Sequence, residues 1–377
     1  MRTAYSVETV RAAERELMAR LPEGALMQRA AAGLAAVCAG LPARVYGSRI
    51  VLLVGPGDNG GDALYAGARL ARRGAAVTAV PMDPERMHAG GLAALRAAGG
   101  RVEEAVPQRA DLVVDGLLGI GGRGGLRPAA AALVERIPQG VPVVAVDLPS
   151  GVDADTGEVA GPAVTADVTV TFGAYKPGLL IDPGASRAGV VRLVDIGLEL
   201  PSPQVEALQH ADVAGLLPVP TASSDKYRRG VVGIVAGSAQ YPGAAVLAVA
   251  GALRGGAGAV RYVGPAAEAV LARYPETLIG PGRVQAWVVG PGLGTDEDGA
   301  AALWFALDTD LPVLVDADGL TMLAAHPDLV AGRSAPTVLT PHAGEFARLA
   351  GSPPGDDRVG ATRRLADALG ATVLLKG

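Results

Sequence analysis

Four oxygen-bearing side chains follow short apolar runs of this 377-residue sequence, where they could hold a cation or move a proton. Asn59 lies in a glycine-rich loop, Asp115 closes a second apolar run, and Asp147 and Ser150 follow a third. If the runs are parallel strands, their carboxyl ends lie along one edge of a sheet, where ligands bind. We therefore expect these four side chains to converge, although each one alone is also an ordinary loop or helix-capping residue.

The loop around Asn59 has the spacing G-x-G-x-x-G over residues 55–60, between an apolar run and a helical stretch that starts at Asp62. That spacing on its own is typical of dinucleotide sites, in which a helix N-terminus binds a pyrophosphate. Asp58 and Asp62 flank the position of the pyrophosphate, and two carboxylates would repel it. Carboxylate and amide oxygens suit a hard cation better. A nicotinamide dehydrogenase is therefore the weakest interpretation of this loop.

A second glycine-rich segment, residues 119–125, carries five glycines and Arg123, and Arg127 follows it. Exposed backbone amides and guanidinium groups suit phosphate or pyrophosphate. The alternative is a flexible surface turn that binds nothing.

The composition excludes several kinds of site. A single cysteine, Cys38, leaves no intramolecular disulfide and no cysteine-rich zinc or iron–sulfur centre, and four scattered histidines argue against a histidine-rich metal centre. A net charge of -5 gives no basic character for nucleic-acid binding. Of 33 basic residues only Lys176, Lys226 and Lys376 are lysines. These positions either need the compact ammonium group of lysine or carry a lysine by chance.

Residues 231–253 form an uncharged stretch that is long enough to cross a bilayer. The glycines and Pro242 inside it favour a buried strand, a glycine loop and a buried helix, so we expect no membrane span. Charged residues interrupt positions 8–16, where the apolar region of a signal peptide would lie. We therefore expect a cytoplasmic protein.

Short apolar runs alternate with helical stretches along most of the chain, which predicts an α/β fold with parallel sheets covered on both faces. We expect a three-layer αβα domain over residues 1–205, a proline-rich linker with one short helix over 206–224, and a second αβα domain over 225–377. Residues 166–171 and 190–194 are expected strands without a helix between them. This pattern is compatible with a first sheet that is mixed, with both parallel and antiparallel strands.

Four motifs in the first region occur in order and resemble those of one known family. They are GPGDNGGD (55–62), VVDGLLGIGGRGG (113–125), VVAVDLPSGVDADTG (143–157) and TFGAYKPG (171–178). The region resembles the NAD(P)H-hydrate epimerase domain over nearly all of residues 1–200. Asp58 and Ala63 replace an asparagine and a glycine of the family's first motif, and Gln28 stands where an acid is usual.

The resemblance implies a Rossmann-like domain that binds potassium and epimerises the R and S forms of hydrated NADH or NADPH, together called NAD(P)HX. Asn59, Asp115 and Ser150 match the positions of the potassium ligands. Asp147 matches the position of an acid/base or electrostatic stabiliser, because inverting C6 of the ring requires proton transfers and a transient cationic or ring-opened species.

The same resemblance implies further roles in the first region. Lys176 supports its loop or the substrate, and the domain forms a homo-oligomer. The matching substrate positions are Asp58, Asn59, Gly60, Gly61, Asp62, Gly119, Ile120, Gly121, Gly122, Arg123, Gly124, Gly125 and Asp147.

Glycine-rich loops also follow the apolar runs of the second region, at residues 237–243, 290–294, 316–319 and 340–346. The sequence contains no G-x-x-x-x-G-K-[ST] run, which excludes a P-loop enzyme. In this order, the loops resemble the ribokinase-like ADP/ATP-dependent NAD(P)H-hydrate dehydratase over residues 225–377.

This second resemblance implies dehydration of S-NAD(P)HX to NAD(P)H at the expense of ADP or ATP, with Mg²⁺. The matching substrate positions are Gly292, Gly294, His342, Ala343, Gly344, Glu345 and Phe346, and the nucleotide positions are Lys376 and Gly377. Asp316 and Asp318 either face the metal of the nucleotide or cap the next helix. His342 either contacts the substrate or is a loop histidine with satisfied hydrogen bonds.

Members of the dehydratase family continue beyond the Lys376-Gly377 pair to a G-T-G-D motif that supplies an anion hole and a catalytic aspartate. This sequence has no such motif in its second region. We therefore expect an incomplete ribokinase-like domain that does not dehydrate its substrate. Two functions of other classes stay open: a ribokinase-like small-molecule kinase with a regulatory domain, and a non-catalytic nucleotide-binding scaffold.

Overall fold

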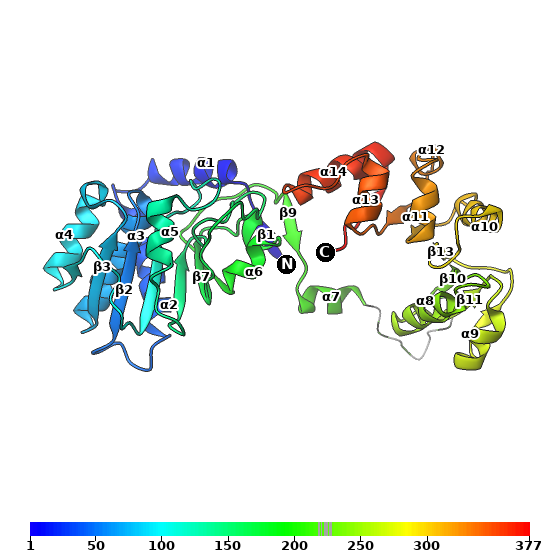
Figure 1. The fold of residues 1–377 in the computed structure, drawn as a ribbon, viewed down its shortest axis with the longest axis horizontal. Coiled ribbons are helices and arrows are strands. Elements are labelled where there is room, and N and C mark those ends of the chain that lie inside the picture. Colours follow the sequence, from blue (N-terminus) through cyan, green and yellow to red (C-terminus); the bar gives the residue numbers. More distant parts are fainter. Residues whose placement is uncertain (218, 220, 222–224, 226–227) are drawn as a thin grey trace. The chain divides into compact units, whose positions relative to one another are not determined.

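The chain folds into two compact units (Figure 1), Met1–Ala214 and Gly215–Gly377. The computed structural model describes residues 1–217, 219, 221, 225 and 228–377. Part of the expected linker, and Lys226 beyond it, lie outside these residues. Each unit is an α/β fold built on one parallel sheet, as the alternation of apolar runs and helical stretches predicts.

Seven parallel strands form the large sheet of the first unit, in the order β4-β3-β2-β5-β6-β7-β8. They are β2 (Arg49–Val54), β3 (Ala76–Pro81), β4 (Arg101–Val102), β5 (Leu112–Gly116), β6 (Val143–Val146), β7 (Val168–Phe172) and β8 (Val190–Val194). The mixed sheet considered from the sequence is wrong, because β8 pairs with β7 in parallel. A 3₁₀ turn (Pro177–Leu179) and the short helix α6 (Gly184–Ala188) make the crossover that parallel pairing requires.

Helices cover both faces of this sheet, because its central strands are apolar on both sides. The helices are α2 (Ala25–Ala39), α3 (Asp58–Arg72), α4 (Ala89–Ala97) and α5 (Pro128–Val134). In β2, Ile50 and Leu52 pack into one apolar cluster with α2, α3 and α4. Val51 and Leu53 alternate with them along the strand and pack with α5 in a second cluster. The first unit therefore has three layers.

A separate two-stranded sheet extends the first unit beyond the boundary expected from the sequence. Here β1 (Arg2–Ala4) pairs antiparallel with β9 (Val205–Ala207), and α7 (His210–Leu216) follows. The amino group of Met1 lies 2.7 Å from the Asp212 carboxylate. These contacts join residues some 200 positions apart in the sequence, so the local composition, which indicates a linker, does not reveal them.

The second unit also contains seven parallel strands, in the order β12-β11-β10-β13-β14-β15-β16. They are β10 (Val231–Val235), β11 (Ala259–Tyr262), β12 (Leu278–Ile279), β13 (Ala286–Val289), β14 (Val313–Val315), β15 (Thr337–Leu339) and β16 (Thr372–Val373). The uncharged stretch noted in the sequence forms β10 and most of α8 (Pro242–Arg254). In the part of the chain that the structure describes, no helix has the length and apolarity needed to span a membrane.

Two groups of helices flank the second sheet. Ile234 packs in one apolar cluster with Val249 of α8 and Val270 of α9 (Ala267–Arg273). Val235 packs in another cluster with the remaining helices. These are α10 (Glu297–Leu307), α11 (Asp318–Leu323), α12 (Asp328–Ala331), α13 (Ala343–Ala350) and α14 (Arg358–Leu369).

Leu52→Ala should destabilise the first unit by about 2–5 kcal/mol, because Leu52 is fully buried and packs against Gly67 of α3. Urea unfolding followed by far-ultraviolet circular dichroism measures this loss. Both tryptophans, Trp287 and Trp304, lie in the second unit, so their fluorescence should report little change there. Leu41→Ala, at an exposed position, is the control. A loss below about 1 kcal/mol for Leu52→Ala would contradict this packing.

Candidate active site

A cavity of about 1250 Å³ opens in the first unit at the carboxyl ends of β2, β5 and β6. Asp58, Asn59 and Asp62, which follow β2, line the cavity together with Asp147, which follows β6. The segment 117–122, which follows β5, completes this side of the cavity. Ligands of parallel α/β folds bind at this edge of the sheet. The structure thus brings polar residues singled out from the sequence to one place.

Several of the expected substrate residues lie outside the cavity lining. Gly60 and Gly61 are buried inside α3. Residues 123–125 do not belong to the lining, and Gly125 packs elsewhere: a Cβ on it would lie 2.9 Å from the Cα of Gly161. Only the first part of the second glycine-rich segment therefore faces the cavity.

The first glycine loop is shorter than the sequence indicates, because α3 begins at Asp58 and not at Asp62. A Cβ on Gly55 would lie 1.8 Å from the carbonyl oxygen of Leu117, and a Cβ on Gly60 would lie 2.1 Å from the carbonyl oxygen of Gly55. Only glycine permits such close backbone approaches. The first turn of α3 therefore packs directly against the chain that leaves β5.

Asp115 is fully buried at the end of β5 and is hydrogen-bonded to Ser150. Its carboxylate accepts hydrogen bonds from the Ser150 hydroxyl (2.7 Å) and from the Ser150 backbone N–H (2.8 Å). Burial raises the pKa of Asp115 to about 6, although the hydrogen bonds from Ser150 and from the Leu117 N–H oppose this shift. The Ser150 hydroxyl also accepts a hydrogen bond from the Leu118 N–H (2.9 Å), which fixes both side chains against the segment after β5.

Asn59 reaches the same segment from α3. A Cβ on Gly119 would lie 2.9 Å from the side-chain oxygen of Asn59, whose buried side-chain nitrogen has no hydrogen-bond partner among the described residues. Asn59, Asp115 and Ser150 therefore bring amide, carboxylate and hydroxyl oxygens to one segment, a donor set that fits a hard monovalent cation. In the described ranges, no group of three or more histidine, cysteine, aspartate or glutamate side chains could hold a metal ion.

Asp147 forms a buried ion pair with Lys176. Lys176 Nζ lies 2.5 Å from Asp147 Oδ1, and the two side chains are only 1% and 9% exposed. The ammonium also donates to Thr171 Oγ1 (2.9 Å) and to the carbonyl oxygen of Phe172 (3.1 Å), so all three of its N–H groups are used. Lys176 thus holds the Asp147 carboxylate in place.

These contacts occupy only one oxygen of Asp147. Oδ1 accepts hydrogen bonds from Lys176, from the Thr171 hydroxyl (3.1 Å) and from the Phe172 N–H (3.4 Å). Oδ2 makes no hydrogen bond within the part of the chain described here. A carboxylate with one oxygen held by an ammonium and the other left without a partner can exchange a proton with a ligand in the cavity.

The helix α1 (Val7–Met18) supplies cavity residues that the sequence does not reveal. Four of its side chains line the cavity: Arg11, Glu14, Arg15 and Met18. A hydrogen bond from the Val7 N–H to the Asp155 carboxylate (2.8 Å) ties the helix to the chain that follows β6. The charges of α1 have the pattern of an ordinary solvent-exposed helix face, so no local signal marks them as part of a site.

Two carboxyl groups of the cavity, Asp62 and Glu14, have raised pKa values. Burial, followed by the charges of Asp147, Asp58 and Glu14, raises the pKa of Asp62 well above its usual value. Burial also raises the pKa of Glu14, but the nearby Lys176 charge opposes that shift. The cavity therefore places one ion-paired carboxylate beside a carboxyl group that favours its neutral form.

In the second unit, the glycine-rich loops contact one another at the carboxyl ends of the strands. The N–H of Gly237 donates to the carbonyl oxygen of Pro291 (2.8 Å), and the N–H of Gly294 donates to the Asp318 carboxylate (3.0 Å). Gly292 packs between these contacts against the side chains of α8 and its preceding loop. The loops after β10, β13 and β14 thus form one edge, as the motif order predicts.

A lysine and two carboxylates meet at the same edge. Lys376 Nζ lies 2.7 Å from Asp316 Oδ1 and 3.8 Å from Glu345 Oε2. The helix-cap interpretation of Asp316 and Asp318 is wrong at α11, whose N-terminus has no side-chain cap. Carboxylate oxygens suit Mg²⁺ and an ammonium suits phosphate, so these residues fit a magnesium nucleotide.

His342 caps the helix α13. Its Nδ1 accepts hydrogen bonds from the N–H groups of Gly344 (3.0 Å) and Glu345 (3.3 Å), and the Glu345 carboxylate accepts one from the His342 N–H (2.9 Å). The histidine therefore has the satisfied loop role considered from the sequence, while its side chain stays 57% exposed and open to a ligand. Phe346, expected at the substrate, is buried in the apolar core, where its side chain serves packing.

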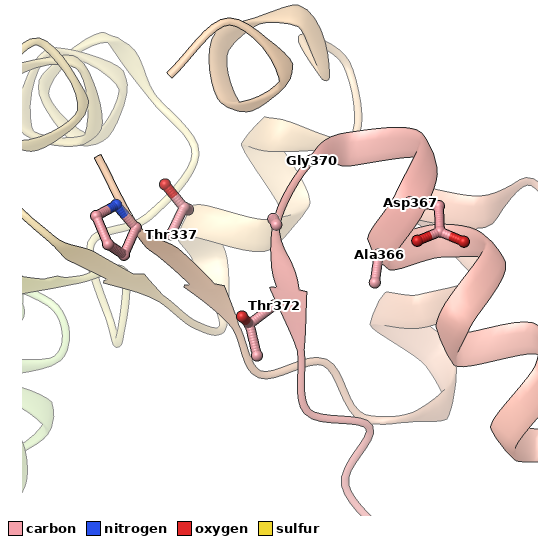
Figure 2. A pocket seen from close by; sticks show the side chains of 7 residues that line it. Thr337, Ala366, Asp367, Gly370 and Thr372 are labelled. Atoms are coloured by element: carbon pink, nitrogen blue, oxygen red, sulfur yellow. The ribbon is translucent and has the colours of Figure 1, made fainter. Parts of the chain in front are cut away.

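A smaller pocket of about 410 Å³ lies elsewhere in the second unit (Figure 2). Thr337 of β15 and Thr372 of β16 line it, together with Asp367 and Gly370 at the end of α14. Both threonines are the first residues of their strands, so the pocket lies at the amino ends of the sheet. Ligands of parallel sheets bind at the opposite ends, and we assign none to this pocket.

Comparisons with known proteins cover both units. The family model described as YjeF-related protein N-terminus matches residues 23–178, and the model described as NAD(P)H-hydrate dehydratase matches residues 232–377. The bifunctional NAD(P)H-hydrate repair enzyme Nnr of Mycobacterium tuberculosis is 60% identical over 387 residues, which span 100% of this chain and 81% of that protein. The protein of the same name from Corynebacterium glutamicum is 38% identical over 464 residues, with coverage of 100% and 80%.

Solved structures are similar to parts of the chain. The ADP/ATP-dependent NAD(P)H-hydrate dehydratase of Bacillus subtilis, co-crystallized with ATP/Mg²⁺, is 29% identical and covers 45% of this chain and 65% of its own, with a TM-score of 0.40. A yeast protein, YNL200c, is 22% identical and covers 54% of this chain and 96% of its own, with a TM-score of 0.44.

Lys176→Met should destabilise the first unit by about 3–5 kcal/mol, because it leaves the Asp147 carboxylate buried without its cation. Urea unfolding followed by circular dichroism measures the loss. The double variant Lys176→Met/Asp147→Asn should recover part of it, since no unpaired charge then remains. Arg49→Met is the matched control, because its ion pair with Asp111 is exposed and such pairs are weak. Equal losses for Lys176→Met and Arg49→Met would contradict a special role of the buried pair.

Proposed function

Because the chain belongs to the family of bifunctional NAD(P)H-hydrate repair enzymes, we propose that its first unit epimerises R- and S-NAD(P)HX in the cavity at the ends of β2, β5 and β6. The family combines an epimerase with an ADP/ATP-dependent dehydratase, and both domains are present in this chain. The observation that carries the proposal is the Asp147 carboxylate, held by Lys176 through one oxygen at the cavity wall. Neither a small-molecule kinase nor a non-catalytic scaffold has comparable support.

The chemistry of the substrate explains why such a carboxylate is needed. The hydrated ring carries a hydroxyl group on C6, next to N1, and the two epimers differ only at C6. Inversion requires a bond to C6 to break and to form again on the other face, with one proton supplied and one removed. Asp147 removes the proton through Oδ2, and its negative charge stabilises a cationic ring.

Cationic and glycine-rich groups at the cavity fit the phosphates of the substrate. A Cβ on Gly121 would lie 3.1 Å from Arg11 Nη2, so this guanidinium lies against the second glycine-rich segment. Arg11, Arg15 and the backbone amides of that segment suit a pyrophosphate. Both arginines are exposed whereas Asp147 is buried, so we place the phosphates near α1 and the ring beside Asp147.

We also propose that Asn59, Asp115 and Ser150 hold a potassium ion, since their oxygens fit a hard monovalent cation. When bound, the ion would supply a fixed positive charge at the end of β5. The buried Asp115 carboxylate would then gain a counter-charge, which offsets the cost of its burial.

The second unit belongs to the NAD(P)H-hydrate dehydratase family, and we propose that it binds ADP or ATP with Mg²⁺ at the ends of β14, β15 and β16. Asp316 and Glu345 would hold the metal, and Lys376 would bind a phosphate. In this family dehydration uses the S epimer, so epimerisation makes the R epimer available for repair. Homo-oligomer formation, a cytoplasmic location and the absence of nucleic-acid binding stay predictions.

The chain should interconvert R- and S-NAD(P)HX without added nucleotide, and Asp147→Asn should lower the rate by about 10²-fold or more. This substitution keeps the shape of the side chain but removes the charge that accepts the proton. Chromatographic separation of the epimers measures the rate. Asp111→Asn, at an exposed carboxylate of the same unit, is the control and should keep the unaltered rate. An unchanged rate in Asp147→Asn would remove Asp147 from this role.

Potassium should raise the melting temperature of the first unit more than tetramethylammonium does at the same ionic strength, because a bound ion stabilises only the folded state. At about 100 times the Kd, the gain is about 2.7 kcal/mol. Asp115→Asn should abolish the difference between the salts, and Asp111→Asn should keep it. Circular-dichroism melting curves in the two salts measure the effect. Equal melting temperatures of the unaltered protein in both salts would rule against the potassium site.

A further inference from the structure

Asp62 lines the cavity from the first two turns of α3 and is only 8% exposed. Its Oδ1 atom is buried and has no hydrogen-bond partner among the described residues. No ion pair of Asp62 is found in those residues either. A buried carboxylate without a partner is costly, so this position favours the neutral acid.

The anionic groups around Asp62 act in the same direction. Asp58 from the start of α3, Glu14 from α1 and Asp147 from the loop after β6 all raise the pKa of Asp62, in addition to the larger effect of burial. Each of these neighbours repels a second negative charge at Asp62.

The cationic groups near the cavity are committed elsewhere or exposed. Lys176 donates all of its N–H groups to Asp147 and to β7. Arg11 and Arg15 are exposed on α1. His88, at the N-terminus of α4, accepts a hydrogen bond from the Gly91 N–H (3.0 Å) through its Nδ1. None of these groups forms an ion pair with Asp62 in the described part of the structure.

We propose that Asp62 is the proton donor of the epimerisation and that Asp147 is the proton acceptor. This inference rests on the proposed epimerase function and adds a second reacting group to it. The Asp147 carboxylate forms an ion pair with an ammonium, whereas Asp62 is buried among carboxylates and has an unpartnered oxygen. Two carboxyl groups with opposite environments supply an acid and a base at the same pH.

Each proton and electron pair has a place in the reaction. The C6–O bond breaks with its electron pair on the oxygen, which takes the Asp62 proton and leaves as water. The lone pair of N1 forms the N1=C6 bond of a cationic ring. Water then adds to the opposite face of C6, the N1=C6 pair returns to N1, and Asp147 takes the released proton. Proton exchange with solvent restores both carboxyl groups, and no oxidant, reductant or co-reactant is consumed.

The other carboxyl groups of the cavity fit the donor role less well. Burial also raises the pKa of Glu14, but the positive charges of Lys176 and Arg11 oppose this shift, and Glu14 is less buried than Asp62. Asp58 is exposed at the first residue of α3. Among the described cavity carboxyl groups, only Asp62 combines a buried, unpartnered oxygen with the absence of an ion pair.

Asp62→Asn tests the proposal because the amide keeps the shape of the side chain but is not an acid. It should lower kcat of epimerisation by about 10²–10⁴-fold, with KM nearly unchanged. Asp62→Glu keeps a carboxyl group and should retain part of the activity. Asp111→Asn is the matched control and should keep both constants. Chromatography of the two epimers measures the rates.

The pH dependence separates an acid from a residue that only supports the fold. In the unaltered protein, kcat should fall at high pH as Asp62 loses its proton, and this alkaline limb should vanish in Asp62→Asn. The pKa of Asp62 is higher in the folded than in the unfolded state, so its protonated form stabilises the folded protein. This contribution is fully present below about pH 4 and is lost as the pH rises through the folded-state pKa. Asp62→Asn should therefore be at least as stable as the unaltered protein above neutral pH.

Labelled water tests the bond that breaks. Cleavage of C6–O predicts one ¹⁸O atom from H₂¹⁸O in each inverted molecule, and inversion with retention of oxygen overturns this step. A kcat of Asp62→Asn within about 3-fold of the unaltered value, or a retained alkaline limb, overturns the role of Asp62 and leaves the proposed function intact. A chain that shows no epimerisation at all overturns the proposed function, and this inference with it.

Discussion

The buried contact between Lys176 and Asp147 is the interaction on which the site in the first unit depends. Each charge is stable in the interior only because the other is present, since removing either partner leaves an uncompensated buried charge. The ammonium is also bound to Thr171 and Phe172 of β7, and the Asp147 N–H donates to Val170 of the same strand (2.8 Å). The position of the reacting carboxylate is therefore set by the pairing of β6 with β7.

Close backbone packing brings the other half of the site to this carboxylate. Gly55 and Gly60 allow the start of α3 to lie directly on the chain that leaves β5. This approach carries Asn59 to the segment that already binds Asp115 and Ser150. Three loops that are far apart in the sequence become neighbours because β2, β5 and β6 are adjacent in one parallel sheet.

Three aspartates of the site have different roles because their environments differ. Asp147 forms an ion pair with the Lys176 ammonium. Asp115 accepts hydrogen bonds that partly oppose the effect of complete burial, and its pKa is raised to about 6. Asp62 has an unpartnered oxygen and anionic neighbours, which favour its neutral form. Sequence spacing places all three at or shortly after the ends of strands, but only their neighbours in space decide which one holds a proton.

The sequence by itself determined the α/β class, the glycine loops at the strand ends and most of the polar residues gathered there. These features follow from local apolar periodicity and motif order, which each segment carries within itself. Only the tertiary structure decided that α1 lines the cavity, that β1 pairs with β9, that the first sheet is entirely parallel, and that Lys176 holds Asp147. Such contacts join segments that lie far apart in the chain. Their formation depends on packing and on the pairing of buried charges, and neither leaves a periodic signal in the sequence.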